Sequence, residues 1–523
     1  MRNKPLPVLI LGLLLCFGCS NQKQTLIKDV VTTQNGQVSG TFDEVSGITA
    51  FKGIPFAAPP VGDLRWKAPQ PVESWEGVKE CTAFSASPIQ GTPMPFSMWT
   101  QEFIAPKEPL SEDCLYLNVW TGAQTADEKL PVFVYIYGGG FSSGSTAVPI
   151  YDGEEMAKKG IVFVTPNYRV GTMGFLAHPD LTAESPNHAS GNYGLLDQVE
   201  ALKWVHENIQ AFGGDPNNVT IAGQSAGAFS VNYLVASPLT KGLIHRAIAE
   251  SGGAVVSNSA LSRGSALKAA EEAGVKFAES LGCSSIEELR AKTPEEILSV
   301  RGSSRPIVDG YFLPKTVGEI FESGEQNDIP VILGWNKNEG FGPPAVSADQ
   351  FNERVKTMFG DMVDEFLQKF PVNSDEEAAA IQNDLGTLQT FGIQSYKWMQ
   401  IQDKTGTAPV FMYRFERDVP YADGMQDYGA FHTGEVPYAY NNLKMSPRPW
   451  TDADYKLADT MSDFWVNFAK NGDPNGENLP DWEVCLPDQL KSMIFNTEVQ
   501  CTETPNAELL KFLDEFYSKN DSK

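Results

Sequence analysis

Ser225 lies in a pattern that suits a serine nucleophile. The residues from Gly223 to Gly227 read G-x-S-x-G, a pattern in which the serine occupies a sharp turn between a strand and a helix. The apolar run 219–222 predicts the strand, and residues 226–234 predict the helix. A strained backbone at the serine demands small residues two positions away on either side, and both are glycines. The expected chemistry is attack of the Ser225 hydroxyl on a carbonyl carbon.

A serine nucleophile needs a base, and the base needs an acid that orients it. His432 lies in a predicted loop, and Glu339 follows the predicted strand 331–333. A carboxylate at the C-terminal end of a strand in an open sheet faces the crevice where ligands bind. Taken alone, a loop histidine or a loop glutamate is more often structural. The chain order Ser225, Glu339, His432 is that of α/β-hydrolases, which favours a catalytic role for all three.

Gly138, Gly139 and Gly140 follow the predicted strand 131–137. Because these residues lack side chains, their backbone N–H groups can approach an oxyanion that develops on a substrate. Ala226 begins the predicted helix after the serine, where free N–H groups and the helix dipole favour negative charge. The glycine segment and the helix start together predict an oxyanion hole.

Such residues require a frame of parallel strands separated by helices. The strands 131–137 and 161–165 are almost continuously apolar, as expected when both faces of a sheet are covered. Strand alternating with helix predicts an α/β fold with a mostly parallel central sheet flanked by helices, in which segments 260–300 and 345–405 are helical insertions that cap the sheet. Further elements are expected as antiparallel strands within 31–54, a strand at 115–120, and helices at 154–159, 195–212 and 453–470, the last of these being the final helix.

Composition excludes several classes of function. The chain has 523 residues and a formal net charge of −26. Such acidity argues against binding to nucleic acid and against electrostatic binding to anionic membranes. No break in composition divides residues 29–518, so we expect one catalytic domain there.

The first residues resemble a bacterial export signal. Arg2 and Lys4 precede an apolar run that is too short to span a bilayer. Gly18 directly precedes Cys19, which resembles the lipoprotein pattern in which the cysteine is acylated. We therefore expect a signal peptide at 1–18, lipidation of Cys19, a tether at 19–28 and anchoring in the cell envelope. An ordinary secretion signal, giving a periplasmic or secreted protein, and a retained anchor stay open.

Export permits disulfides. Cys81 with Cys114 is the favoured pair, and Cys485 with Cys501 is a second candidate across a strand pair. The cysteine spacings match no zinc pattern, and the chain has five histidines. We expect no metal site and no cofactor.

The order of motifs resembles that of the type-B carboxylesterase/lipase family, which includes cholinesterases and bacterial para-nitrobenzyl esterases. Besides the three segments described above, the motifs that carry the resemblance are Phe51-Lys52-Gly53-Ile54-Pro55-Phe56-Ala57, Leu64-Arg65-Trp66, Ser111-Glu112-Asp113-Cys114-Leu115-Tyr116-Leu117-Asn118-Val119-Trp120, Asn167-Tyr168-Arg169, Asn192-Tyr193-Gly194-Leu195-Leu196-Asp197-Gln198, Phe212-Gly213-Gly214-Asp215-Pro216 and Val308-Asp309-Gly310. They are spread over residues 29–515. A series of this length in one order is highly specific.

The resemblance implies an α/β-hydrolase fold and a serine carboxylesterase that acts through an acyl-serine intermediate. It implies that the N–H groups of Gly139, Gly140 and Ala226 bind the oxyanion. It also implies that Ser251 lies beside the triad, although a loop cap explains this serine equally well. The substrate implied is a small-molecule ester.

Three features depart from the family. Gln224 stands where relatives often have glutamate, so a negative charge beside the site is absent. Ile104 stands near the place of the choline-binding tryptophan of cholinesterases, which disfavours recognition of a quaternary ammonium. The usual partner of the cysteine at Cys114 is replaced by Pro88, which puts the favoured disulfide in doubt.

Three alternatives to a general carboxylesterase remain at this point. One is a lipase, and another is a specialised esterase that acts on polymer-linked or natural-product esters. The third, a binding protein without activity, is disfavoured because the three polar residues and the glycine segment are all present. An apolar wall beside the site is expected from Met94, Phe96, Met98, Trp99 and Phe103.

Overall fold

Buried, nearly continuous apolar segments form the centre of the protein. The computed structural model describes residue 27 and residues 30–256, 265–342, 344–421, 424 and 426–521. Six strands at the centre run parallel to one another. They are β9 (Leu130–Ile136), β10 (Val162–Pro166), β11 (Gly214–Gln224), β12 (Arg246–Glu250), β15 (Val331–Asn336) and β16 (Val410–Phe415). Their parallel pairing confirms the predicted α/β fold.

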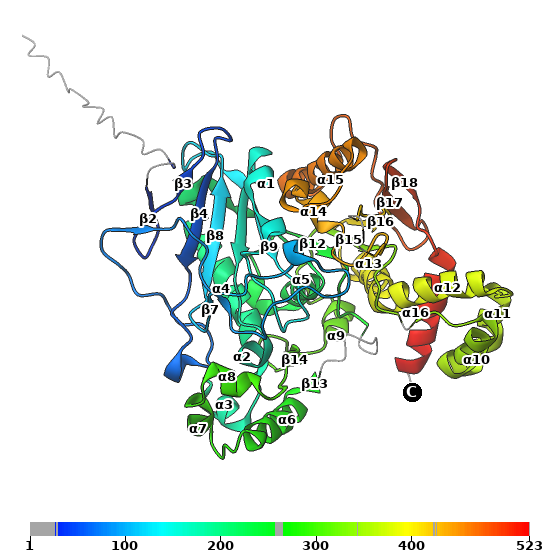
Figure 1. Cartoon of the computed structure of the whole chain (residues 1–523), viewed down its shortest axis with the longest axis horizontal. Coiled ribbons are helices and arrows are strands. Elements are labelled where there is room, and N and C mark those ends of the chain that lie inside the picture. Colours follow the sequence, from blue (N-terminus) through cyan, green and yellow to red (C-terminus); the bar gives the residue numbers. More distant parts are fainter. Residues whose placement is uncertain are drawn as a thin grey trace, which may run out of the picture.

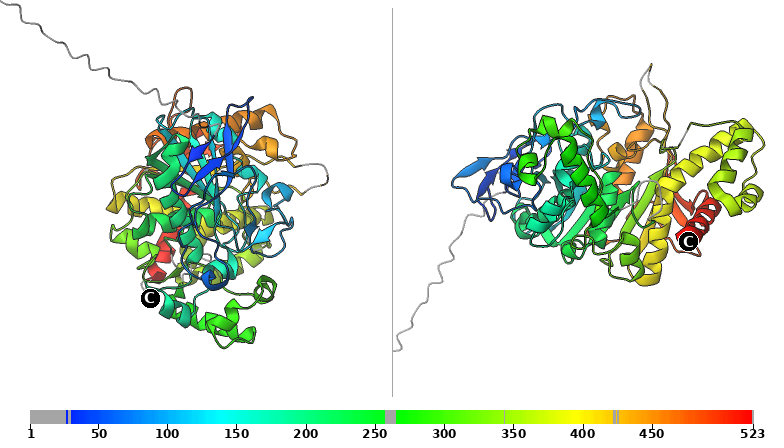
Figure 2. Two further views of the ribbon diagram at one scale, coloured as in Figure 1. Left: turned by 90° about the vertical axis from the view of Figure 1, so that its left-hand side faces the viewer. Right: turned by 90° about the horizontal axis from the view of Figure 1, so that it is seen from below.

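Within the described residues the main sheet has 11 strands in the order β18-β17-β16-β15-β12-β11-β9-β10-β8-β4-β3. Antiparallel pairs occur toward its two edges. The outer strands are β3 (Thr41–Phe42), β4 (Thr49–Pro55), β8 (Tyr116–Thr121), β17 (Lys491–Phe495) and β18 (Gln500–Glu503). The early strands and the late strands therefore lie at opposite ends of the molecule, as Figures 1 and 2 show.

Smaller strand pairs lie outside the main sheet. β1, β2 and β5 form a three-stranded sheet, whereas β6 pairs with β7 and β13 pairs with β14. Their bounds are β1 (Val31–Thr32), β2 (Gln37–Ser39), β5 (Val78–Glu80), β6 (Ser87–Pro88), β7 (Leu110–Ser111), β13 (Ser265–Ala266) and β14 (Ile307–Val308).

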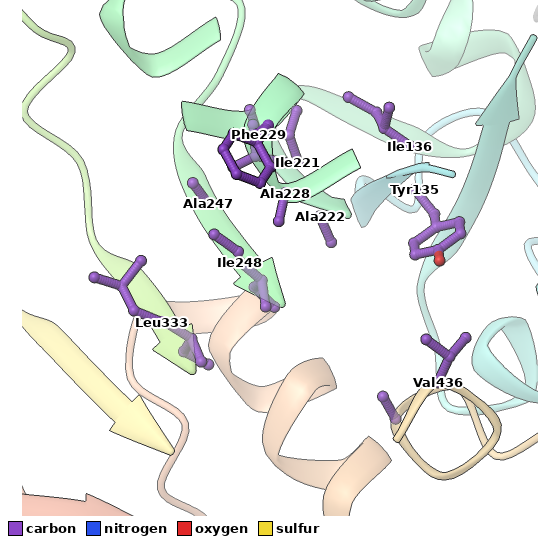
Figure 3. Close-up of a cluster of buried hydrophobic side chains, with 14 of the residues drawn as sticks. Tyr135, Ile136, Ile221, Ala222, Ala228, Phe229, Ala247, Ile248, Leu333 and Val436 are labelled. Atoms are coloured by element: carbon purple, nitrogen blue, oxygen red, sulfur yellow. The ribbon is translucent and has the colours of Figure 1, made fainter. Parts of the chain in front are cut away.

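Both faces of the central strands are covered. Side chains alternate along β9, so that Ile136 faces helix α5 (Ala226–Ala236) and Tyr135 faces α14 (Val436–Ala439), as Figure 3 shows. The Tyr135 ring lies 4.7 Å from the ring of Tyr440, measured between centroids. Burial on both faces accounts for the continuous apolar runs of these strands.

Helices occupy the connections between strands. The structure contains α1 (Glu154–Lys158), α2 (Gly171–Phe175), α3 (Pro179–Glu184), α4 (Tyr193–Asn208), α9 (Val317–Glu322) and α15 (Asp452–Asn471). Short 3₁₀ turns occur at Gly62–Leu64, Gln101–Phe103, Pro149–Tyr151, Ile209–Phe212, Pro238–Thr240, Gly360–Met362 and Leu443–Met445.

Two helical insertions extend from this frame. The first contains α6 (Leu267–Ser280), α7 (Ile286–Arg290) and α8 (Pro294–Leu298), which gather with α3 around a separate apolar cluster (Figure 1). The second contains α10 (Ala348–Phe359), α11 (Val363–Lys369), α12 (Asp375–Thr387), a π-helical turn at Leu388–Gly392 and α13 (Ile393–Thr405). Both agree with the expected helical segments 260–300 and 345–405, of which 260–264 lies outside the described residues.

The end of the chain differs from the prediction. The helix expected at 453–470 is α15, but it is followed by β17, β18 and α16 (Ala507–Asp521). Phe512 on α16 packs against Phe359 and Phe366, with centroid distances of 5.1 and 5.4 Å. This long-range aromatic packing joins the last helix to the second insertion, and no local pattern indicated it.

The expected disulfides are absent. All five cysteines in the described part of the chain are free thiols. Cys114 lines a small internal space together with Pro88, so the side chain beside it offers no sulfur. The Cys81 thiol instead donates a hydrogen bond to the carbonyl of Gly53 at 3.8 Å, and burial raises its pKa to about 11. Cys485 and Cys501 are likewise unbridged.

The expected signal peptide at 1–18, Cys19, and all but residue 27 of the expected tether lie outside the described residues. Within the residues that the structure describes, no helix is long and apolar enough to cross a bilayer.

Candidate active site

Ser225 occupies a sharp turn at the end of β11 and the start of α5. Its backbone has φ 56° and ψ −124°, a conformation that is costly for a residue with a side chain. A Cβ on Gly223 would lie 2.5 Å from the carbonyl carbon of Gly227, and a Cβ on Gly227 would lie 2.0 Å from the oxygen of Ile136. Because both contacts are with backbone atoms that cannot move aside, the elbow requires glycine at both positions.

His432 and Glu339 are in direct contact. The imidazole Nδ1 lies 2.6 Å from Glu339 Oε2, and both side chains are buried. The other carboxylate oxygen accepts hydrogen bonds from Ser251 Oγ at 2.8 Å and from the backbone N–H of Asn336 at 2.7 Å. With Nδ1 donating to the carboxylate, Nε2 of His432 is the ring nitrogen left to accept a proton.

Three aromatic side chains surround the imidazole. Phe391 stacks on it with a centroid distance of 4.9 Å and an angle of 15°. Phe341 and Trp99 approach edge-on at 4.8 and 6.1 Å, and Trp99 Nε1 donates to Thr433 Oγ1 at 3.1 Å. The rings confine the orientation of His432. Sequence reasoning missed Phe341, although it closely follows Glu339, and it missed Phe391, which lies in the π-helical turn and carries no local signal.

Gln224 lies beside the same imidazole. Its Nε2 is 3.3 Å from His432 Nε2, and its Oε1 accepts a hydrogen bond from Thr433 Oγ1 at 3.3 Å. The amide is buried. A neutral side chain therefore occupies the place beside His432 that an acidic residue was expected to fill in relatives.

The glycine segment lies against the elbow. A Cβ on Gly138 would be 2.6 Å from the oxygen of Gln224 and 3.0 Å from Ser225 Cβ. Gly139 has φ 115° and Gly140 has φ 61°, and both are exposed. The structure thus places Gly138 against Ser225, and Gly139 and Gly140 line the same cavity as the serine. Ala226 is in the first turn of α5, where backbone N–H groups have no acceptor within the helix.

Several of these groups line one cavity of about 820 Å³. Ser225, His432, Gln224, Ala226 and the glycines from 138 to 140 line it. Part of the expected apolar wall is present, since Met94, Phe96, Trp99 and Phe103 also line the cavity. Met98 does not, because its side chain is directed toward Gly340, as shown by its Cε lying 2.7 Å from where a Cβ on that glycine would stand.

Two buried carboxyl groups lie behind the triad, and sequence reasoning missed both. Glu250 accepts hydrogen bonds from Tyr440 and from Trp465, each at 2.8 Å. Burial raises its pKa to about 7. Burial, together with the nearby carboxylates of Glu339 and Glu250, also holds the pKa of Glu435 well above its usual value. Glu250 directly precedes Ser251, and Glu435 follows His432 by three residues. These positions in the chain were the signals that could have pointed to the two carboxyl groups.

Among the described residues, no group of three or more His, Cys, Asp or Glu side chains is placed to hold a metal ion. The groups that the site offers for chemistry are a buried acid, an imidazole, a hydroxyl on a strained turn and backbone donors beside it.

Comparisons with known proteins agree with this geometry. The Carboxylesterase family matches residues 27–513. Fumonisin B1 esterase of Sphingopyxis macrogoltabida is 38% identical, over 86% of this chain and 83% of that protein. Cocaine esterase of Homo sapiens is 35% identical, over 90% and 88%. Para-nitrobenzyl esterase of Bacillus subtilis (strain 168) is 34% identical, over 92% and 97%. The chain therefore belongs to the carboxylesterase family, and it is a serine hydrolase of carboxylic esters.

Proposed function

We propose that Ser225 is the nucleophile of this esterase, with His432 as its general base and Glu339 as the acid that orients the base. The observation that carries the proposal is the 2.6 Å contact between His432 and Glu339, together with the cavity that His432 and Ser225 both line. His432 Nε2 takes the hydroxyl proton while Ser225 Oγ bonds to the ester carbonyl carbon. The ester C–O bond then breaks, and the alkoxide leaves with the proton from the imidazolium.

The second half of the cycle repeats these steps with water. His432 removes a proton from the water as its oxygen attacks the acyl carbon, and the proton then returns to Ser225 Oγ as the acid product leaves. In both halves the carbonyl oxygen becomes negatively charged. We assign its stabilisation to the N–H groups of Gly139, Gly140 and Ala226, because all three residues line the cavity around Ser225.

The test is hydrolysis of 4-nitrophenyl esters from acetyl to palmitoyl. Ser225→Ala is expected to lower kcat by at least about a thousandfold, because the oxyanion hole alone retains only a small part of the rate. Thr92→Val removes another hydroxyl from the same cavity and serves as the matched control, with an expected change within about threefold. Equal turnover by Ser225→Ala would overturn the assignment. Preference for long acyl chains would identify a lipase, and turnover confined to bulky natural or polymer esters would identify a specialist.

We further propose that the chain is exported and anchored through Cys19. Support comes from the charged start, the short apolar run and the Gly18–Cys19 junction. In a bacterial host, Cys19→Ser is expected to abolish incorporation of labelled fatty acid and to release the esterase from the membrane fraction. Cys16→Ser lies in the same apolar run and is the control, with labelling retained. Labelling that persists in Cys19→Ser would contradict the proposal.

A further inference from the structure

The wall of the catalytic cavity carries one permanently charged side chain among the described residues, and it is a cation. Arg305 lines the cavity, together with apolar residues, hydroxyl groups, Gln224 and His432. No aspartate or glutamate of the described chain lines it. In a protein with a formal net charge of −26, a cavity wall without carboxylates and with one guanidinium has the opposite sign to the molecule as a whole.

Arg305 has no counter-charge among the described residues, whereas several arginines elsewhere in the chain have one. Several arginines pair with carboxylates, namely Arg65 with Glu112, Arg169 with Asp197, Arg290 with Glu184, Arg417 with Asp454 and Arg448 with Glu102. In the described part of the chain, Arg305 forms no ion pair or hydrogen bond. The segment 257–264, which precedes β13, contains no aspartate or glutamate.

The backbone of Arg305 is fixed by the residues that follow it. Pro306, which is buried and also lines the cavity, restricts the backbone of the residue before it to extended conformations. Asn192 then holds the start of β14, donating to the carbonyl of Ile307 at 2.9 Å and accepting from its N–H at 3.0 Å. The Arg305 charge acts on the Tyr233 hydroxyl, where it opposes the rise in pKa that burial causes. The backbone at Arg305 is therefore fixed, and its exposed side chain lines the same cavity as Tyr233 of α5.

The neutral amide of Gln224, like the charge of Arg305, favours an anionic substrate. A glutamate beside His432 would repel an anionic ester, and the glutamine does not. A guanidinium presents a planar set of donors that matches a carboxylate in two hydrogen bonds. We propose that this esterase hydrolyses esters that carry a free carboxylate group, and that Arg305 binds that carboxylate while Ser225 attacks the ester carbonyl. The inference rests on the proposed function and names its substrate class.

The carboxylate can belong to either half of the ester, and two matched substrate pairs distinguish the halves. The acyl arm compares the mono-4-nitrophenyl ester of adipic acid with 4-nitrophenyl hexanoate. The alcohol arm compares 4-(butanoyloxy)benzoate with its methyl ester. In each arm the measured quantity is the ratio of kcat/KM for the acidic ester to kcat/KM for the neutral ester, which cancels any general loss of activity in a variant.

Arg305→Ala is expected to lower this ratio by about tenfold in one arm, in line with one charge-assisted hydrogen-bonded pair that is partly exposed to water. Arg305→Glu is expected to lower it further, and Arg305→Lys to keep part of it. The wild-type ratio is expected to fall between about 0.01 M and about 1 M salt, as the Debye length shortens from about 30 Å to about 3 Å. Arg301→Ala removes an exposed arginine of the same loop that does not line the cavity, and its ratio is expected to stay at the wild-type value.

A ratio that is unchanged in Arg305→Ala and Arg305→Glu in both arms would overturn the inference, as would poor hydrolysis of both acidic esters by the wild type. Competitive inhibition of hexanoate ester hydrolysis by adipate gives a second measurement, and it is expected to weaken in Arg305→Ala. Failure of the proposed function has a different signature, because then none of the four esters would show turnover that depends on Ser225.

Discussion

At the scale of single residues, the site depends on how firmly Glu339 is held. One carboxylate oxygen contacts His432, and the other accepts two hydrogen bonds, from Ser251 Oγ and from Asn336 N–H. These two donors fix the plane of the carboxylate, which in turn fixes the imidazole. The loop serine is thus built into the hydrogen-bond network of the site and does not merely cap a turn.

Ser251→Ala is expected to lower kcat about tenfold with little change in KM, because the lost hydrogen bond to a charged group orients the base and does not bind substrate. Steady-state kinetics on a short-chain 4-nitrophenyl ester measures both constants. Ser462→Ala is the control, since that buried serine donates to carbonyls of its own helix. A rise in KM with kcat unchanged would contradict a positioning role.

At the scale of elements, the elbow depends on close approach between α5 and the strand β9. The carbonyl of Ile136 occupies the space where Gly227 would carry a Cβ. Any side chain there must push the start of α5 away from the sheet, and Ser225 with it. The geometry of the turn at Ser225 and the packing of α5 on the sheet therefore both depend on the absence of a side chain at Gly227.

Gly227→Ala is expected to lower the free energy of unfolding by about 3 kcal/mol or more, as overpacking against backbone does, and to abolish turnover. Thermal unfolding and the yield of soluble protein report the effect. Gly91→Ala is the matched control, because a Cβ there meets no atom within 4 Å, and its Tm should match the wild type. A Gly227→Ala variant with a wild-type Tm and activity would refute the steric argument.

At the scale of the whole molecule, the buried acids join elements that are far apart in sequence. Glu250 ends β12, while its partners Tyr440 and Trp465 come from the segment after α14 and from α15. One oxygen of Glu250 and one of Glu435 are buried without a hydrogen-bond partner among the described residues. Keeping such groups protonated avoids most of the cost of burying charge.

This arrangement makes stability depend on pH. Burial raises the pKa of Glu250 to about 7 in the folded protein from an ordinary value of 4.5, so the folded state binds more protons than the unfolded state between these pH values. The contribution of Glu250 to the free energy of unfolding is fully present below about pH 4.5. It is lost as the pH rises through 7, and the loss is on the order of 3 kcal/mol.

Urea unfolding at a series of pH values checks this sign. Relative to the wild type, Glu250→Gln should lose less stability between pH 4.5 and pH 8, because the amide does not titrate. Glu207→Gln, at an exposed position, should follow the wild-type curve. Parallel curves for wild type and Glu250→Gln would show that burial does not govern the titration of this carboxyl group.

The sequence by itself was enough to propose Ser225 as the nucleophile and to give the order of its expected partners. One sharp turn requires Gly223, Ser225 and Gly227 close together in the chain, so the pattern can be recognised before the fold is known. The apolar strands and the helices between them follow from side-chain periodicity, which is also local. These features sufficed to predict a mostly parallel sheet and the cluster of Ser225, Glu339 and His432 at its edge.

Only the tertiary structure decided the surroundings of those residues. Phe391 stacks on His432 from a π-helical turn, Glu250 takes its donors from the segment after α14 and from α15, and Arg305 reaches the cavity from the loop before β14. The structure also leaves Cys81, Cys114, Cys485 and Cys501 as free thiols, in contrast to the predicted disulfides. Contacts between segments hundreds of residues apart depend on how the layers pack, and packing leaves no periodic signal in the chain.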